Sequence, residues 1–271
     1  MNRLRVVTVV IAVTVFAVTG CHLFTKSEPT LERWSGLIGD LRTQWTAEPG
    51  IDLLSGPAVP VRAYLESRWL AQWAGNLDYA YPGFADAVPP NAKDTANLGA
   101  AQRRPVVDTH LDAPFIGNDQ FHIMSISGSI HITATICNFN YSVSKPNQDG
   151  TVYSLARAQT REPRGIFAEQ IFLAAPSAPA NPPLPPQEGR AAAPAVDVFG
   201  GWQIVGNLSA ISVGLPGFDA AWPTYDADTA KCVAKAPDPP ARIAFLINGN
   251  HPRSDFPTSP PSPGWPEKKD K

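Results

Sequence analysis

Apolar residues recur every three or four positions in two stretches near the start of the chain, and this spacing predicts two amphipathic helices. The first stretch covers residues 27–48, opens with Ser27-Glu28-Pro29 and is stopped by Pro49-Gly50. The second covers residues 60–76. Each carries an apolar stripe that we expect to pack against a sheet: Leu31, Trp34, Ile38, Leu41 and Trp45 in the first, and Val61, Leu65, Trp69, Trp73 and Leu77 in the second.

An alternating pattern follows the helical one. Between residues 124 and 136 the even positions are mostly apolar and the odd positions are Ser, Thr or His. This alternation predicts a half-buried strand, with Gly128 as a bulge, a bend or a hairpin tip. We expect further strands near residues 151–159, 165–173, 202–213 and 242–247. Because no helical crossovers separate these segments, the sheet should be mainly antiparallel and the fold class α+β.

Proline accounts for 29 of the 271 residues, roughly twice its usual share, which argues against a mostly helical protein. Its densest clusters lie in residues 174–194 and after residue 256. We therefore expect a single α+β domain over residues 28–250. Within it, residues 174–194 should form an extended surface loop, and residues 251–271 a disordered Pro-rich tail.

The N-terminus has the layout of a secretory signal peptide: two arginines, an uncharged apolar run over residues 6–18, and small residues before Cys21. The run is too short for a transmembrane helix, which needs about 20 apolar residues. A cysteine directly after Gly20 resembles the lipobox of bacterial lipoproteins. The resemblance implies a signal peptide over residues 1–20, a lipid on Cys21, a tether over residues 21–27, and a place on the extracytoplasmic face of the cell membrane. The alternative is an ordinary secretory signal with an incidental cysteine.

With Cys21 lipidated, two cysteines are left, Cys137 and Cys232. An even pair in an oxidising compartment predicts a disulfide. Its loop of about 95 residues would be worth roughly 4–5 kcal/mol in the loop-entropy model. The alternative is a pair of buried free thiols.

Two Trp-rich helical segments are followed by a strand that ends in Ile136–Asn140, by a strand that begins at Gly200–Val205, and by Cys232. This order resembles small secreted or lipid-anchored actinobacterial proteins with a nuclear-transport-factor-two-like, cystatin-like fold. The resemblance covers about residues 28–232 and implies two N-terminal helices packed on a strongly curved antiparallel sheet. It implies no catalytic residue, because such folds host enzymes, ligand binders and scaffolds alike.

One group of residues could carry metal chemistry. Asp108, His110 and Asp112 alternate along the chain, so on a strand their side chains would face one side and could bind a divalent metal. The segment resembles the first metal-binding strand of amidohydrolase-type barrels and membrane dipeptidases. The chain lacks the alternating β/α pattern of such barrels. A solvated edge or turn is the alternative interpretation, and no motif for an organic cofactor occurs.

These observations favour a membrane-anchored, non-enzymatic lipoprotein that binds a cell-envelope partner or a small apolar ligand. The alternative is a metal-dependent hydrolase that uses Asp108, His110 and Asp112, with His131 as a further ligand. A third possibility is an envelope assembly subunit that acts through its Pro-rich segments. The net charge of −2 does not favour nucleic-acid binding.

The lipobox leads to a direct prediction for Cys21. When bacteria that express the chain are grown with a radiolabelled fatty acid, the protein should carry the label, and Cys21→Ser should remove it, because the thiol is the site of lipid attachment. Label that persists on the Cys21→Ser protein would place the lipid elsewhere.

Overall fold

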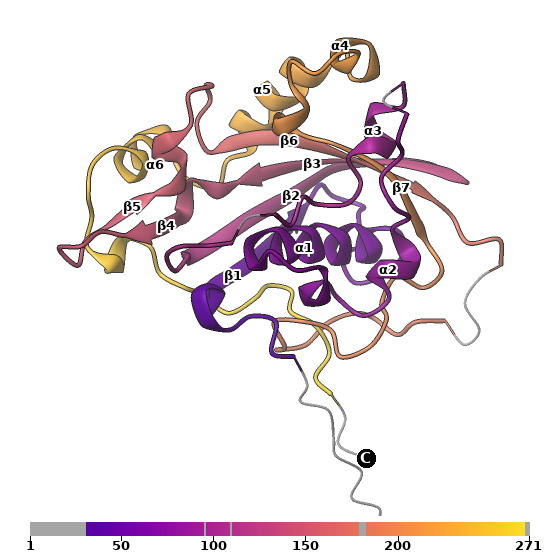
Figure 1. Cartoon of the computed structure of the whole chain (residues 1–271), viewed down its shortest axis with the longest axis horizontal. Coiled ribbons are helices and arrows are strands. Elements are labelled where there is room, and N and C mark those ends of the chain that lie inside the picture. Colours follow the sequence, from indigo (N-terminus) through magenta and orange to yellow (C-terminus); the bar gives the residue numbers. More distant parts are fainter. Residues whose placement is uncertain (1–30, 95, 109, 179–182, 269–271) are drawn as a thin grey trace, which may run out of the picture. The chain divides into compact units, whose positions relative to one another are not determined.

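The computed structural model describes residues 31–268, apart from residues 95, 109 and 179–182. The expected signal peptide, Cys21 and the tether lie outside the described residues. Glu32–Lys271 form one compact unit (Figure 1). Its helices are α1 (Ala58–Ala74), α2 (Phe84–Ala87), α3 (Leu98–Ala101), α4 (Phe218–Ala221), α5 (Tyr225–Lys235) and α6 (Pro240–Ile247). In the described part of the chain, no helix has the length and apolar character needed to cross a bilayer.

Seven strands form a single sheet: β1 (Asp40–Ala47), β2 (Ile116–Gly128), β3 (His131–Phe139), β4 (Val143–Pro146), β5 (Val152–Ser154), β6 (Ile166–Ala174) and β7 (Gln203–Leu208). The central order β2-β3-β6-β7 is antiparallel, and β1 pairs with β2 in parallel. β4 pairs with β2 beyond the end of β3, and β5 pairs with β4. The expected α+β class with a curved, mainly antiparallel sheet is therefore confirmed.

Helices cover the two faces of this sheet. α1 packs on one face, where its apolar side chains join Phe121, Ile136 and Ile171 in a large cluster. On the other face α5 packs against β6, and α5 and α6 contribute to a second cluster. Cys137 of β3 and Cys232 of α5 form a disulfide within that second cluster, which confirms the predicted pair.

The hairpin β2–β3 and the helix α1 follow the sequence pattern. Gly128 lies at the tip of the hairpin with a φ of 99°, and a Cβ atom there would lie 1.9 Å from the carbonyl oxygen of His131. Of the three expected roles for Gly128, the hairpin tip is therefore the one that the structure adopts. α1 falls within two residues of the predicted helix over 60–76.

The helix predicted over residues 27–48 is wrong where the structure describes the segment, because its second half forms strand β1 and only a three-residue 3-10 turn at Gly36–Ile38 precedes that strand. Leu41 and Trp45 are four positions apart, and this separation places side chains on the same side of a strand as well as of a helix. Thr43 is buried between them, as the strand period requires. Gly36 takes a φ of 59°, which breaks a helix, and β2 offers eight paired positions.

The strand predicted at residues 242–247 is also wrong, because the segment lies in helix α6. A short apolar run does not distinguish a buried strand from a helix. Here Pro240 occupies the first turn of the helix, where its fixed φ is favourable. Leu246 and Ile247 are buried, whereas Phe245 is exposed.

The expected disorder of the tail is contradicted for residues 251–268. The tail runs beside β1, where the N–H of Trp45 donates to the carbonyl of Ser262 and the N–H of Ser262 donates to that of Thr43. Trp265 is only 1% exposed. Its backbone exchanges two hydrogen bonds with Ala191 of the Pro-rich 174–194 segment. After Ala174, the last residue of β6, the described part of that segment forms no helix and no strand of the main sheet, as expected for a loop, but it covers the core together with the tail.

A buried carboxylate joins these segments. Glu66 of α1 accepts hydrogen bonds from the indole nitrogens of Trp45 at 2.7 Å and Trp265 at 2.8 Å, and from the Tyr81 hydroxyl at 2.5 Å. The guanidinium of Arg62 lies 4.4 Å above the Trp265 ring. Burial raises the pKa of Glu66, and the charge of Arg62 and the three donors oppose that rise. One side chain of α1 therefore binds β1, the Tyr81 loop and the tail.

Candidate functional site

The structure does not bring Asp108, His110 and Asp112 together as a metal site. Residues 108 and 110–112, which the structure describes, form no strand, so the alternating positions no longer place the side chains on one side. Asp112 forms an ion pair with Lys145 at 3.0 Å, and His110 Nδ1 lies 3.2 Å from the carbonyl oxygen of Ala74. Among the described residues, no group of three or more His, Cys, Asp or Glu side chains is arranged to hold a metal ion.

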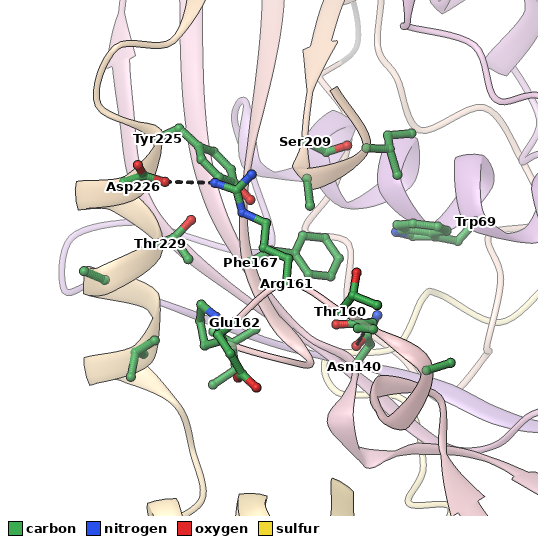
Figure 2. A pocket seen from close by; sticks show the side chains of 18 residues that line it. Trp69, Asn140, Thr160, Arg161, Glu162, Phe167, Ser209, Tyr225, Asp226 and Thr229 are labelled. Atoms are coloured by element: carbon green, nitrogen blue, oxygen red, sulfur yellow. Dashed lines mark hydrogen bonds and ion pairs between the residues drawn. The ribbon is translucent and has the colours of Figure 1, made fainter. Parts of the chain in front are cut away.

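A cavity of about 940 Å³ is the strongest candidate site. It lies where β6 begins and β7 ends, between Trp69 of α1, Phe167 of β6, Ile211 after β7, and Tyr225 and Val233 of α5 (Figure 2). The helix α5 is held against the sheet by the disulfide between Cys137 and Cys232, so one wall of the cavity is covalently fixed to β3. The exposed surface of the walls is mainly apolar, although eight of the eighteen lining residues are polar or charged.

A cation already lies against an aromatic wall of this cavity. The guanidinium of Arg161 is 5.2 Å from the centre of the Tyr225 ring and forms an ion pair with Asp226 at 3.1 Å. Figure 2 shows this pair at one side of the cavity. Both charged groups are largely exposed, so the pair is worth little to stability. It marks the solvent side of the cavity.

Two polar atoms in the cavity walls have no partner in the part of the chain that the structure describes. They are the hydroxyl of Thr229, a residue only 7% exposed, and the buried indole nitrogen of Trp69. A buried donor without a hydrogen bond costs about 1–3 kcal/mol.

A line of buried polar side chains crosses four strands next to the cavity, on the face that α1 covers. We call it the polar row: Asp119 of β2, Asn138 of β3, Glu169 of β6 and Asn207 of β7, which are 0–2% exposed. Arg68 of α1 supplies a positive charge to Glu169. Among the described residues, the two carboxyl oxygens of Glu169 have no well-aligned hydrogen-bond partner. The same is true of the side-chain oxygen and nitrogen of Asn138 and of Asn207.

Burial dominates the protonation of the two acids in the polar row. It raises the pKa of Glu169 to about 7, although the charge of Arg68 and the nearby amides of Asn207 and Asn138 oppose the rise. Burial and the negative charge of Glu169 together raise the pKa of Asp119 well above its ordinary value. Two nearby carboxyls and one guanidinium therefore favour a state in which one carboxyl keeps its proton.

Neither the cavity nor the polar row was predicted from the sequence. The sequence does contain an indication of the polar row. Asn138 continues the apolar even positions of its strand, and Glu169 lies between Phe167 and Ile171 on the same side. Polar residues at apolar positions of a strand indicate a buried polar group. The cavity leaves no comparable signal, since its walls come from segments more than 150 residues apart.

The raised pKa of Glu169 predicts how stability depends on pH. Between its ordinary pKa of 4.5 and about 7, the folded protein holds a proton on Glu169 that the unfolded chain releases, so stability falls as the pH rises. The full effect is at most about 3 kcal/mol. Glu169→Gln should lose less stability than the wild type between pH 5 and pH 8 in urea unfolding. Glu162→Gln, at an exposed carboxylate, serves as the control and should keep the wild-type slope. An unchanged slope in Glu169→Gln would contradict the prediction.

No protein-family model, curated protein or solved structure matches this chain. The lipobox at Cys21 and the nuclear-transport-factor-two-like arrangement therefore stay predictions from the sequence. The candidate site depends on the geometry of this chain alone.

Proposed function

We propose that this protein is a lipid-anchored, extracytoplasmic binding protein that takes a small apolar ligand into the cavity beside Trp69. The observation that carries the proposal is the cavity itself. Its volume of about 940 Å³ lies within the usual range for ligand pockets, about 300–1,000 Å³. Apolar walls with a few polar groups are typical of such sites.

The hydrophobic effect supplies the driving force for binding. Burial of apolar surface is worth roughly 25 cal/mol per Å², and the rings of Trp69, Phe167 and Tyr225 offer such a surface. Ile211 and Val233, which are 59% and 44% exposed, would be covered by a ligand. The wall formed by α5 is fixed by the disulfide, which lowers the entropy lost on binding.

The anchor and the cavity belong to one function in this proposal. The lipid on Cys21 would keep the compact unit Glu32–Lys271 at the membrane surface, where apolar molecules are concentrated. Two or three acyl chains give durable attachment, whereas one gives only marginal binding. The domain would then exchange its ligand with the membrane or with an envelope partner.

A neutral fluorescent dye tests the cavity. The chain from residue 22 onward contains the whole compact unit. It should bind N-phenyl-1-naphthylamine with a rise in dye fluorescence, because the dye enters an apolar site. Val233→Glu places a charge in the wall and should weaken the affinity about tenfold.

Val196→Glu is the matched control for this experiment. Val196 is 64% exposed and does not line the cavity, so the variant should bind the dye like the wild type. Equal weakening by both variants, or no binding by the wild type, would contradict the proposed function.

A further inference from the structure

Arg161 is the one cationic side chain among the described residues that line the cavity. Its guanidinium lies 5.2 Å from the centre of the Tyr225 ring, and the attraction of the aromatic face holds it at the cavity wall (Figure 2). Within the part of the chain that the structure describes, this guanidinium forms a single hydrogen bond, from Nη2 to Oδ1 of Asp226 at 3.1 Å. Arginine has several further N–H donors, and they remain for a ligand in the cavity.

Asn140 adds a neutral donor to the cavity wall. The backbone N–H of Gly165 donates to Oε1 of Gln159 at 2.7 Å, and Nε2 of Gln159 donates to Oδ1 of Asn140 at 3.2 Å. Because a backbone N–H can only donate, this chain of hydrogen bonds fixes the orientation of both amides. It uses the oxygen of Asn140 and leaves the amide nitrogen to donate elsewhere. Arg161 and Asn140 therefore both offer donors, which a ligand group rich in acceptors can satisfy.

The two acids that line the cavity already have arginine partners. Glu162 accepts hydrogen bonds from Nε of Arg164 at 2.9 Å and from the backbone N–H of Arg164 at 3.0 Å. Asp226 accepts its hydrogen bond from Arg161. An ammonium group on a ligand would therefore compete with a guanidinium for either acid, whereas an anionic group would find free donors on Arg161. The contact with Asp226 also shows that this guanidinium takes a carboxylate.

The solvent side of the cavity suits a charged end of a ligand. The side chains of Arg161 and Asp226 are 50% and 88% exposed, and an ion pair this exposed contributes little to stability. The charge of Arg161 can therefore be shared with a second carboxylate at small cost. A carboxylate bound at this edge also keeps water on one side, so it avoids most of the cost of burying a charge.

We propose that the ligand is an amphiphile with one carboxylate, as in a fatty acid, whose apolar chain lies in the cavity against Trp69 and Phe167 and whose carboxylate binds Arg161. This inference rests on the proposed function and specifies its ligand class. A carboxylate has the geometry to accept two parallel hydrogen bonds from one guanidinium. A phosphate monoester would bring a larger negative charge beside Glu162 and Asp226 and is disfavoured.

Three probes with the same eight-carbon chain test the inference: n-octanoate, n-octanol and n-octylamine, measured by isothermal titration calorimetry with the chain from residue 22 onward. At neutral pH and low salt the wild type should bind octanoate about fivefold more tightly than octanol, and octylamine most weakly. Arg161→Gln removes the cation and should reduce the preference for octanoate to less than about twofold, with octanol binding unchanged. Octanol thus reports whether the apolar part of the site is intact in the variant.

Asp226→Asn gives a change of the opposite sign. It removes the carboxylate that competes for Arg161 with little change in shape, so octanoate should bind about twofold to threefold more tightly than to the wild type. Arg157→Gln is the matched control, because Arg157 is an exposed arginine four positions away that does not line the cavity. This variant should keep the wild-type preference for octanoate.

The outcomes separate the inference from the proposed function. The inference is wrong and the proposed function stands if octanol binds but octanoate binds no better, or if octylamine binds most tightly. The same holds if Arg161→Gln keeps the preference, if Arg157→Gln loses it equally, or if Asp226→Asn weakens octanoate binding. If none of the three probes and no dye bind, the proposed function fails and the inference fails with it.

Discussion

The fold depends on one buried carboxylate, that of Glu66 on α1. An isolated ion in a protein interior costs several kcal/mol, so it persists only where donors and charges surround it. Two indoles, one phenol and the Arg62 guanidinium provide this surrounding, and they come from β1, the Tyr81 loop, the tail and α1 itself. Glu66 therefore joins segments up to 199 residues apart, in addition to the backbone hydrogen bonds that the tail forms with β1 and with Ala191.

This contact also explains why α1 can hold the candidate site. α1 is buried on almost every side, because the sheet covers one side and the Pro-rich segment and the tail cover another. Two residues beyond Glu66, Arg68 supplies its charge to the polar row, and Trp69 lines the cavity. The same helix thus connects the closure of the fold to the proposed ligand site. The disulfide on the other face holds the opposite wall in place.

The fold class, α1, the hairpin at Gly128 and the disulfide could be predicted because local spacing, turn chemistry and cysteine count determine them. β1 could not, because Leu41 and Trp45 satisfy the helix and strand periods equally, and a parallel partner 76 residues away decides between them. The tail was misjudged from its prolines. Proline prevents regular structure but not burial, and Trp265 finds its acceptor on a distant helix. The polar row needed the sheet register, which places four strands side by side.

A double-mutant cycle between Glu66 and Trp265 tests the central claim most directly. The unfolding free energies of Glu66→Gln, Trp265→Phe and the double variant are compared with that of the wild type. A hydrogen bond to a charged group predicts a coupling of about 1.5–3 kcal/mol. Effects that add to within about 0.5 kcal/mol would contradict the account, because the tail would then be held without the Glu66 carboxylate.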